Sequence, residues 1–173
     1  MTEQENYMAQ ALALAREAAA AGEVPVGCVI VRGGEIVGRG RNRREEKQST
    51  ASHAEMEAIA MANETVGSWR LDDCTLYVTL EPCPMCAGAI LNARIPRVYY
   101  GARDRAMGAC GGVLNLYVRT HPRARRRHPR GRVPRGAGEF LPRHTGGQVT
   151  IIFIRFNTFV TTDPNFIKTQ PLS

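Results

Sequence analysis

The sequence predicts an α/β fold in which helices cover a mixed β-sheet. Two patterns lead to this prediction: a two-stranded hairpin within residues 24–40, and helix, strand, helix and strand segments that alternate between residues 53 and 100. Such an alternation places helices against a sheet. The chain of 173 residues has the length of one domain, and its hydrophobic content of 43% is ordinary for a globular protein.

The N-terminal segment has the pattern of a helix followed by the hairpin. Apolar side chains recur on one stripe of residues 3–21, and Gly22 is a suitable end for that helix. Residues 24–31 form a short apolar run, residues 32–34 have turn composition, and residues 35–40 run back. Because the first helix is amphipathic and carries acidic residues, it has the pattern of neither a signal peptide nor a membrane span.

The next segments supply a loop and a second helix. Residues 41–52 are polar and are expected to form a loop that carries Asn42. Ser52 is a suitable N-cap for a helix that begins at His53. The apolar side chains expected to face inward from this helix are Met56, Ile59 and Ala60.

A strand, a helix and a further strand complete the pattern. Residues 76–80 have strand composition, and residues 84–92 are predicted to form a helix with proline in its first turn, where proline is tolerated. Residues 98–100 form another short strand, and residues 101–112 form a glycine-rich loop. This order supports helices that cover a mixed sheet.

Three side chains have the residue types and spacing of a metal site. Cys83 and Cys86 lie at the expected start of a helix, where two thiolates can hold one ion together. His53, the only histidine before residue 121, lies at the start of the preceding helix. Structural zinc sites close with four protein ligands, whereas catalytic sites keep one position for water. Three ligands therefore predict a catalytic zinc ion.

Glu55 lies two residues after His53 and is suited to move protons without binding the metal. Zinc lowers the pKa of a bound water molecule toward about 7, which suggests hydrolytic attack on an electrophilic carbon. Cys83 and Cys86 alone could be a redox pair, and His53 and Glu55 alone could be an ordinary helix start. Their combination favours the zinc site. The remaining cysteines are expected in the core or a loop, and they are Cys28, Cys74 and Cys110.

These residues carry a resemblance to a known family. His53-Ala54-Glu55 followed by residues 82–86 resembles the signature of the cytidine-deaminase-like zinc deaminases. The likeness covers about residues 4–117 and departs from the usual pattern at Ala51-Ser52 and Pro84. Within the superfamily the sequence resembles the bacterial tRNA-specific adenosine deaminases more closely, in residues 22–27, 41–43, 68–71, 76–83 and 101–104.

The resemblance implies a three-layer α/β/α cytidine-deaminase-like fold with a mixed central sheet. It also implies one Zn2+ per chain, bound by His53, Cys83 and Cys86, and no organic cofactor. The implied reaction is hydrolytic deamination of adenosine to inosine by zinc-activated water. Glu55 would take a proton from this water, deliver it to the purine ring nitrogen and later protonate the departing ammonia.

The resemblance further implies a substrate and a setting. The substrate would be the wobble adenosine of a tRNA anticodon loop, where flipping an unstacked base costs little. Asn42 matches the position that contacts the flipped nucleoside, and Asp104 lies in a loop that approaches the neighbouring nucleotides. The enzymes of this family are homodimers. No membrane partner is expected, and the absence of a secreted disulfide spacing favours the cytoplasm.

The charge is unevenly distributed along the chain. Residues 1–117 hold 12 basic and 14 acidic side chains, whereas residues 118–173 hold 11 basic and 2 acidic ones, so the net charge of +7 comes from the tail. The net positive charge of the whole chain therefore says nothing about residues 1–117. Three regions are predicted: a zinc-dependent deaminase domain at 1–117, an Arg/Pro/Gly-rich tail at 118–147, and an apolar, β-prone segment of unknown role at 148–173.

The tail departs from the family, whose chains continue with two more helices. Nine arginines and several prolines lie within residues 119–143, without a helical pattern. A disordered basic tail, an RNA-binding arm and a shifted reading frame are three explanations. The shifted frame is favoured, because codons for residues 127–143 read one base later permit the Gly-Ile-Leu…Glu-Cys…Phe-Phe-Arg pattern of those helices. The C-terminal helices would then be lost or replaced.

Two other functions are compatible with the site. A related zinc deaminase could act on a free base or nucleoside, such as guanine or cytosine. The stretches at 41–43 and 68–71 favour the tRNA reaction over this alternative. An inactive homologue or a non-catalytic zinc module could bind the metal alone, although a structural site has no use for a proton shuttle at Glu55.

Overall fold

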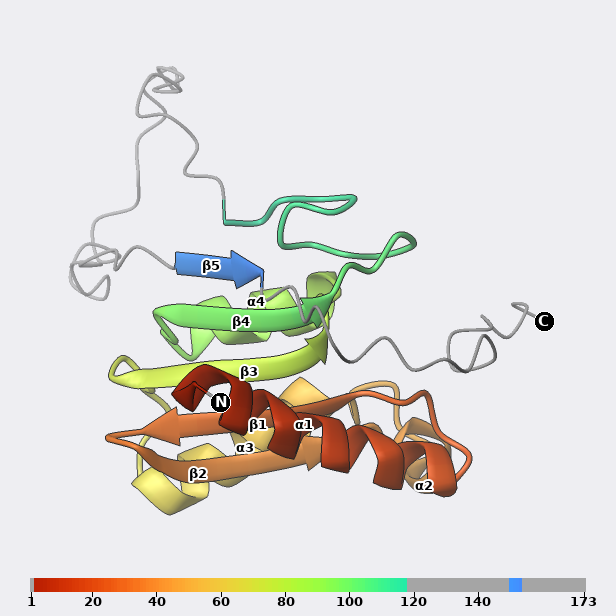
Figure 1. Ribbon diagram of the computed structural model, residues 1–173, viewed down its shortest axis with the longest axis horizontal. Coiled ribbons are helices and arrows are strands. Elements are labelled where there is room, and N and C mark those ends of the chain that lie inside the picture. Colours follow the sequence, from red (N-terminus) through yellow and green to blue (C-terminus); the bar gives the residue numbers. More distant parts are fainter. Residues whose placement is uncertain (1, 118–149, 154–173) are drawn as a thin grey trace, which may run out of the picture.

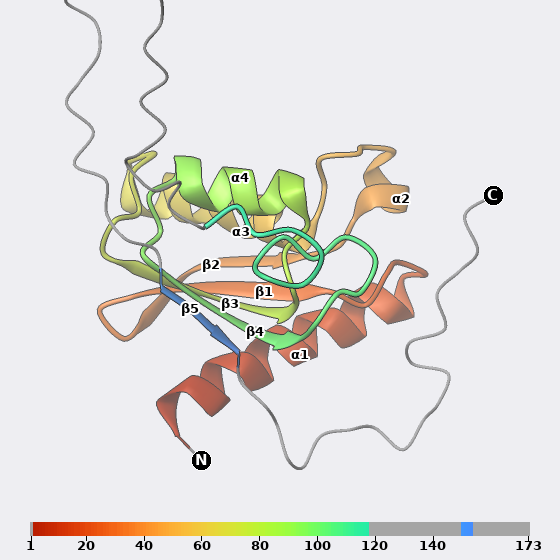
Figure 2. The same ribbon diagram turned by 90° about the horizontal axis from the view of Figure 1, so that it is seen from above.

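The computed structural model describes residues 2–117 and 150–153 (Figure 1). These residues form a five-stranded sheet in the order β2-β1-β3-β4-β5. Helix α1 (Glu3–Ala20) lies on one face of the sheet, and helices α3 (Ala54–Val66) and α4 (Pro84–Asn92) lie on the other (Figure 2). The predicted three-layer α/β/α fold with a mixed sheet is confirmed.

The predicted hairpin forms one side of the sheet. Strand β1 (Gly27–Arg32) pairs antiparallel with β2 (Glu35–Arg41), and the turn between them contains Gly33 and Gly34 with positive φ angles. Strand β1 also pairs antiparallel with β3 (Cys74–Leu80), which places β3 at the centre of the sheet. Positive φ favours glycine, so the turn composition explains the hairpin.

Helix α1 has a defined start and packs closely on β1. The Thr2 hydroxyl accepts a hydrogen bond from the Glu5 amide at 3.2 Å, and the Glu5 carboxylate accepts one from the Thr2 amide at 2.7 Å. These two bonds form a capping box. A Cβ on Gly27 would lie 2.1 Å from the Ala11 carbonyl oxygen, so the helix backbone rests directly on the strand.

The other side of the sheet is parallel. Strand β4 (Arg97–Ala102) pairs parallel with β3, and α4 is the crossover between them. Strand β5 (Thr150–Phe153) pairs parallel with β4 and forms that edge of the sheet. Part of the segment predicted at 148–173 therefore joins the sheet. The predictions about the tail at 118–147 and about lost C-terminal helices fall outside the residues that the structure describes.

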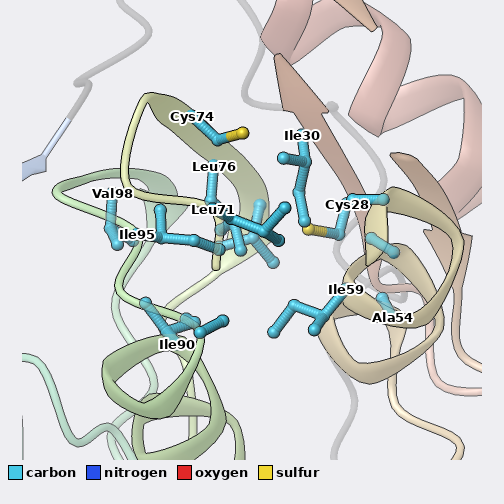
Figure 3. Packing of buried hydrophobic residues seen from close by; sticks show 14 of the residues in the cluster. Cys28, Ile30, Ala54, Ile59, Leu71, Cys74, Leu76, Ile90, Ile95 and Val98 are labelled. Carbon is cyan, nitrogen blue, oxygen red and sulfur yellow. The ribbon is translucent and has the colours of Figure 1, made fainter. Parts of the chain in front are cut away.

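The larger core cluster lies between the sheet and helices α3 and α4. Its members are mostly small or branched apolar side chains, and the three cysteines predicted for the core or a loop all belong to it. None of these three cysteines belongs to the group formed by His53, Cys83 and Cys86, so they are packing residues. Figure 3 labels Cys28, Ile30, Ala54, Ile59, Leu71, Cys74, Leu76, Ile90, Ile95 and Val98 of this cluster.

The prediction for residues 41–52 is incomplete, because this loop contains a short helix, α2 (Arg44–Lys47). No periodic apolar pattern marks four polar residues as a helix. Among the described residues, no helix combines the length and the apolar character needed to cross a membrane.

Two predictions about α3 are wrong. The N-cap is His53 and not Ser52, and Ala60 is exposed. The buried face instead includes Ala58 and Ala62, because α3 packs on glycines of β2 that leave room for its backbone. The inward face of the helix is thus set by the strand beneath it, which the helix sequence alone does not specify.

Candidate active site

The three predicted metal ligands meet at the N-termini of two helices. His53 is the N-cap of α3, Cys83 is the N-cap of α4, and Cys86 lies in the first turn of α4. His53 Nδ1 lies 3.5 Å from Cys86 Sγ and 3.7 Å from Cys83 Sγ. All three ligand atoms lie within 4.8 Å of one another. One imidazole nitrogen and two sulfur atoms suit zinc, so these residues fit the predicted ion.

The start of α4 explains the placement of the two cysteines. Pro84 occupies the first helical position, where a missing N–H group is tolerated, and the Cys83 carbonyl accepts the Ala87 amide at 2.8 Å. Cys86 is buried, and Cys83 is half-buried. The spacing of the pair is therefore fixed by one helical turn.

Of the two cysteine ligands, Cys83 is the one whose ionised form is favoured. The pKa of Cys83 is lowered to about 4, mainly because Cys86 donates a hydrogen bond to its sulfur and also because of His53. The same bond and burial raise the pKa of Cys86, and the bond with Cys83 raises the pKa of His53. A thiolate thus stands where the three donor atoms converge, and thiolate is the form that binds zinc.

Glu55 lies in the first turn of α3, two residues after the histidine ligand. Its side chain is only 4% exposed, and burial raises the pKa of its carboxyl group, as does the negative charge of Cys83. A raised pKa makes a carboxylate a stronger proton acceptor, and the carboxyl group that forms can later donate the proton. The structure therefore places a candidate acid–base group on the same helix turn as a metal ligand.

Asn42 directly follows β2 and is tied to the start of α3. Its backbone N–H donates to the Val26 carbonyl at 3.0 Å, and the backbone N–H of Arg43 donates to the Ser52 carbonyl at 2.9 Å. Ser52 precedes His53, so the asparagine segment is linked to the metal ligand. Asn42 is 6% exposed, and its Oδ1 has no partner among the described residues. An unsatisfied buried acceptor is unusual and can serve a ligand.

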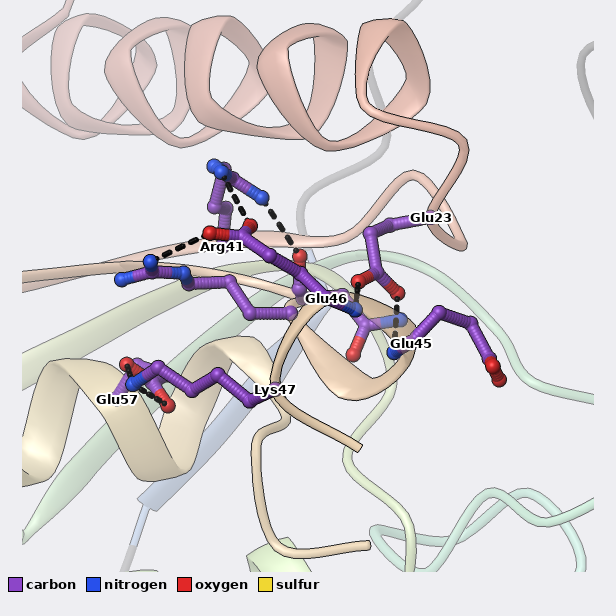
Figure 4. A network of polar contacts seen from close by, with 8 residues as sticks. Glu23, Arg41, Glu45, Glu46, Lys47 and Glu57 are labelled. Atoms are coloured by element: carbon purple, nitrogen blue, oxygen red, sulfur yellow. Dashed lines mark hydrogen bonds and ion pairs between the residues drawn. The ribbon is translucent and has the colours of Figure 1, made fainter. Parts of the chain in front are cut away.

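A polar network holds the segment after the asparagine. The Glu23 carboxylate accepts the Glu45 amide at 3.2 Å and the Glu46 amide at 2.8 Å (Figure 4). Glu46 pairs with Arg41 at 2.7 Å and with Arg43 at 2.6 Å, and the two arginines lower the pKa of Glu46 to about 2. The helix α2 is therefore fixed by ionic and backbone contacts.

Asp104 lies in the loop after β4 and has a clear local role. Its Oδ1 accepts the Ala106 amide at 2.8 Å and the Met107 amide at 3.1 Å, which forms a turn. Its own amide donates to Glu81 Oε2 at 3.3 Å. Glu81 lies two residues before Cys83, so the loop is linked to the metal ligands. The contact of Asp104 with nucleotides stays a prediction.

Glu81 is not among the site residues predicted from the sequence, although it lies in the same stretch as the cysteines. Its side chain is 2% exposed, and Oε1 accepts the Cys110 amide at 3.0 Å and the Gly112 amide at 2.8 Å. A charged residue directly after an apolar strand is a signal, because buried carboxylates need partners. The partners are 29 and 31 residues away, so the sequence does not name them.

The chain is similar to known deaminases. A model of the cytidine and deoxycytidylate deaminase zinc-binding region matches residues 1–102, which include the metal ligands but not Asp104. A tRNA-specific adenosine deaminase of Bacillus subtilis (strain 168) is 49% identical over 116 residues, or 67% of this chain and 72% of that protein.

Two solved structures have the same fold. One, from work on A-to-I editing by tRNA:A34 deaminases at the wobble position of transfer RNA, superposes with a TM-score of 0.67 and 43% identity. The match covers 69% of this chain and 92% of that one. The other is a guanine deaminase from Bacillus subtilis, with a TM-score of 0.55 and 42% identity over 57% of this chain and 64% of that one.

Proposed function

The chain belongs to the cytidine and deoxycytidylate deaminase zinc-binding family, and from this premise we propose that it deaminates adenosine to inosine at the wobble position of a tRNA anticodon. The protein is a hydrolytic deaminase with a zinc cofactor. The observation that most supports the tRNA substrate is the 49% identity to a tRNA-specific adenosine deaminase over 116 residues. An anticodon loop suits such an enzyme because its bases are readily unstacked.

The proposed mechanism divides the work between the ligands and one acid–base group. His53, Cys83 and Cys86 would hold the ion. When bound, zinc supplies Lewis acidity that makes a water molecule nucleophilic at neutral pH. Glu55 would accept a proton as water adds to C6 of adenine and pass it to the ring nitrogen. It would then take the remaining hydroxyl proton at C6 and deliver it to the amino group, which leaves as ammonia. One water is consumed, and inosine and ammonia are the products.

We assign the recognition of the substrate to two residues. The buried Oδ1 of Asn42 is available to a donor group of the flipped nucleoside. Asp104 uses Oδ1 for its own turn, and the described hydrogen bonds leave Oδ2 for a neighbouring nucleotide. The residue after Asn42, Arg43, donates its backbone N–H to the Ser52 carbonyl just before His53, and the Asp104 backbone N–H donates to the Glu81 carboxylate two residues before Cys83.

We further propose that the protein is a cytoplasmic homodimer. Four apolar side chains of the loop after β4 are 42–57% exposed, and a dimer interface would remove them from water; they are Met107, Val113, Leu114 and Leu116. Sedimentation at micromolar concentration should give twice the 19.0 kDa chain mass. A monomer under these conditions would contradict the proposal.

A substrate panel tests the proposed function. An anticodon stem-loop with a wobble adenosine, free adenosine, guanine and cytidine are each incubated with the zinc-loaded protein, and kcat/KM is measured for each. The stem-loop should be preferred by at least about 100-fold over every free base or nucleoside, because only it supplies the phosphate contacts that dominate nucleic-acid affinity. The similarity to a guanine deaminase supports a second candidate, free-base deamination. Preference for guanine would establish that candidate instead.

A further inference from the structure

We propose that Glu81 is a positioning residue whose buried carboxylate fixes the loop at residues 103–117 and thereby sets the affinity for the nucleotides beside the target base. The inference rests on the proposed function, since it concerns how that substrate is held. It concerns a residue that binds neither zinc nor the reacting atoms. Its basis is the hydrogen bonding and the close packing around the carboxylate.

Three backbone amides of one loop donate to this carboxylate. Cys110 and Gly112 donate to Oε1 at 3.0 and 2.8 Å, and Asp104 donates to Oε2 at 3.3 Å. Hydrogen bonds to an ionised acceptor are stronger than neutral ones, and backbone donors have no rotamer freedom. The donors span most of the loop, so the carboxylate determines the course of its backbone.

Two glycines leave room for the carboxylate. A Cβ on Gly108 would lie 2.5 Å from the Glu81 carboxyl carbon, and a Cβ on Gly112 would lie 2.5 Å from Oε2. Neither glycine has a positive φ, so the backbone conformation does not require them. At both positions a side chain is excluded only because it would occupy the space of the Glu81 carboxylate. The loop therefore wraps around Glu81 at contact distance.

The same residue is anchored on the side of the metal ligands. The Glu81 amide donates to the Ala102 carbonyl at 2.8 Å, and the Pro82 carbonyl accepts the Ala109 amide at 2.9 Å. Both residues immediately precede Cys83. Among the described residues, no side chain caps the start of α4, and the hydrogen-bond partners of the Glu81 carboxylate are amides of the loop and not of that helix. Loss of the carboxylate should therefore displace the substrate loop and leave the zinc ligands in place.

The test is Glu81→Gln, which keeps the size of the side chain. Glutamine has one acceptor oxygen, and its NH2 group would face a backbone N–H. We expect KM for the anticodon stem-loop, and its Kd by fluorescence anisotropy, to rise about tenfold, as for a lost charged hydrogen bond. We expect kcat to stay within about threefold, zinc to remain at one per chain, and amide exchange in residues 103–117 to accelerate.

Two further variants make the test specific. Asp73→Asn is the matched control, because Asp73 lies at the other end of β3 and makes a surface ion pair with Arg32 at 2.6 Å. This control should leave KM within about twofold, since exposed ion pairs contribute little. Gly112→Ala pushes a Cβ against the carboxylate and should reproduce the rise in KM. In the double variant, Glu81→Gln with Gly112→Ala, KM should exceed that of the more affected single variant by less than about twofold, because both changes break the same contact.

Each outcome decides one question. Unchanged KM and Kd in both loop variants would overturn the inference, and so would loss of zinc from Glu81→Gln, which would make Glu81 a support of the metal site. A wild-type protein that binds the stem-loop without forming inosine would contradict the proposed function alone. In that case the change in Kd still tests the role of Glu81.

Discussion

The proposed metal ligands and the loop at residues 103–117 are held in different ways. His53 and Cys83 are the N-caps of two helices that pack on the sheet, so their positions follow from where those helices begin. The loop at 103–117 contains only turns and one isolated bridge, between Cys110 and Asn115, and it is organised around a buried carboxylate. This difference predicts that the loop can be displaced while the three proposed metal ligands stay in place.

The largest effect should follow from removing a metal ligand. Cys86→Ala deletes one of the three donor atoms. Loss of a residue that only hydrogen-bonds to a ligand weakens metal affinity by up to about 100-fold, so loss of a ligand itself should weaken zinc binding by more. Inosine formation should become undetectable. Cys74→Ala is the matched control, because Cys74 is equally buried in the core but outside the metal group. Metal analysis after dialysis checks both, and a zinc-replete Cys86→Ala protein would contradict the ligand assignment.

A smaller loss is expected from the acid–base group. Glu55→Gln keeps the shape of the side chain but cannot shuttle a proton, so kcat should fall by about 10²–10⁴-fold. Zinc content should not change, because the carboxylate is not a ligand. Single-turnover kinetics on zinc-loaded protein measure the effect. A decrease of less than tenfold would remove Glu55 from the proposed mechanism.

An intermediate effect is expected where α3 packs on β2, because a shift of this helix would also move the metal ligand at its start. Gly40→Ala would place a Cβ 2.1 Å from the Ala54 carbonyl oxygen, between His53 and Glu55 in the sequence. Overpacking of this kind costs about 1–3 kcal/mol, and zinc affinity should also fall. Gly88→Ala on α4 is the control, because no described atom lies within 4 Å of its Cβ and alanine favours a helix. Equal denaturation midpoints for the two variants would refute the close contact.

The smallest effect concerns acid stability near α2. The pKa of Glu46 is lowered to about 2 by Arg43 and Arg41. A lowered pKa in the folded state stabilises the protein above the unfolded value of about 4.3, and this contribution is lost as pH falls toward 2. Glu46→Gln should therefore flatten the decline of stability between these pH values. Because the pair is partly exposed, the change should be small. Urea unfolding at pH 3 and pH 6 measures it.

Local sequence signals predicted the metal region well. The helix at 84–92 has the predicted bounds, because Pro84 marks its first turn, and the three residues predicted as ligands from residue type and spacing lie together in the structure. The features that the sequence did not predict depend on distant contacts. The inward face of α3 is set by the glycines of β2, and α2 is held by Glu23. The partners of Glu81 likewise lie about thirty residues further along the chain.

Zinc content and inosine formation, measured on one preparation of the wild-type chain, test the central claim most directly. We expect about one zinc per chain and inosine at the wobble position of the stem-loop, with zinc retained and kcat lowered by about 10²–10⁴-fold in Glu55→Gln. A zinc-loaded wild-type protein that leaves the wobble adenosine unchanged while it deaminates free guanine would contradict the proposed tRNA substrate.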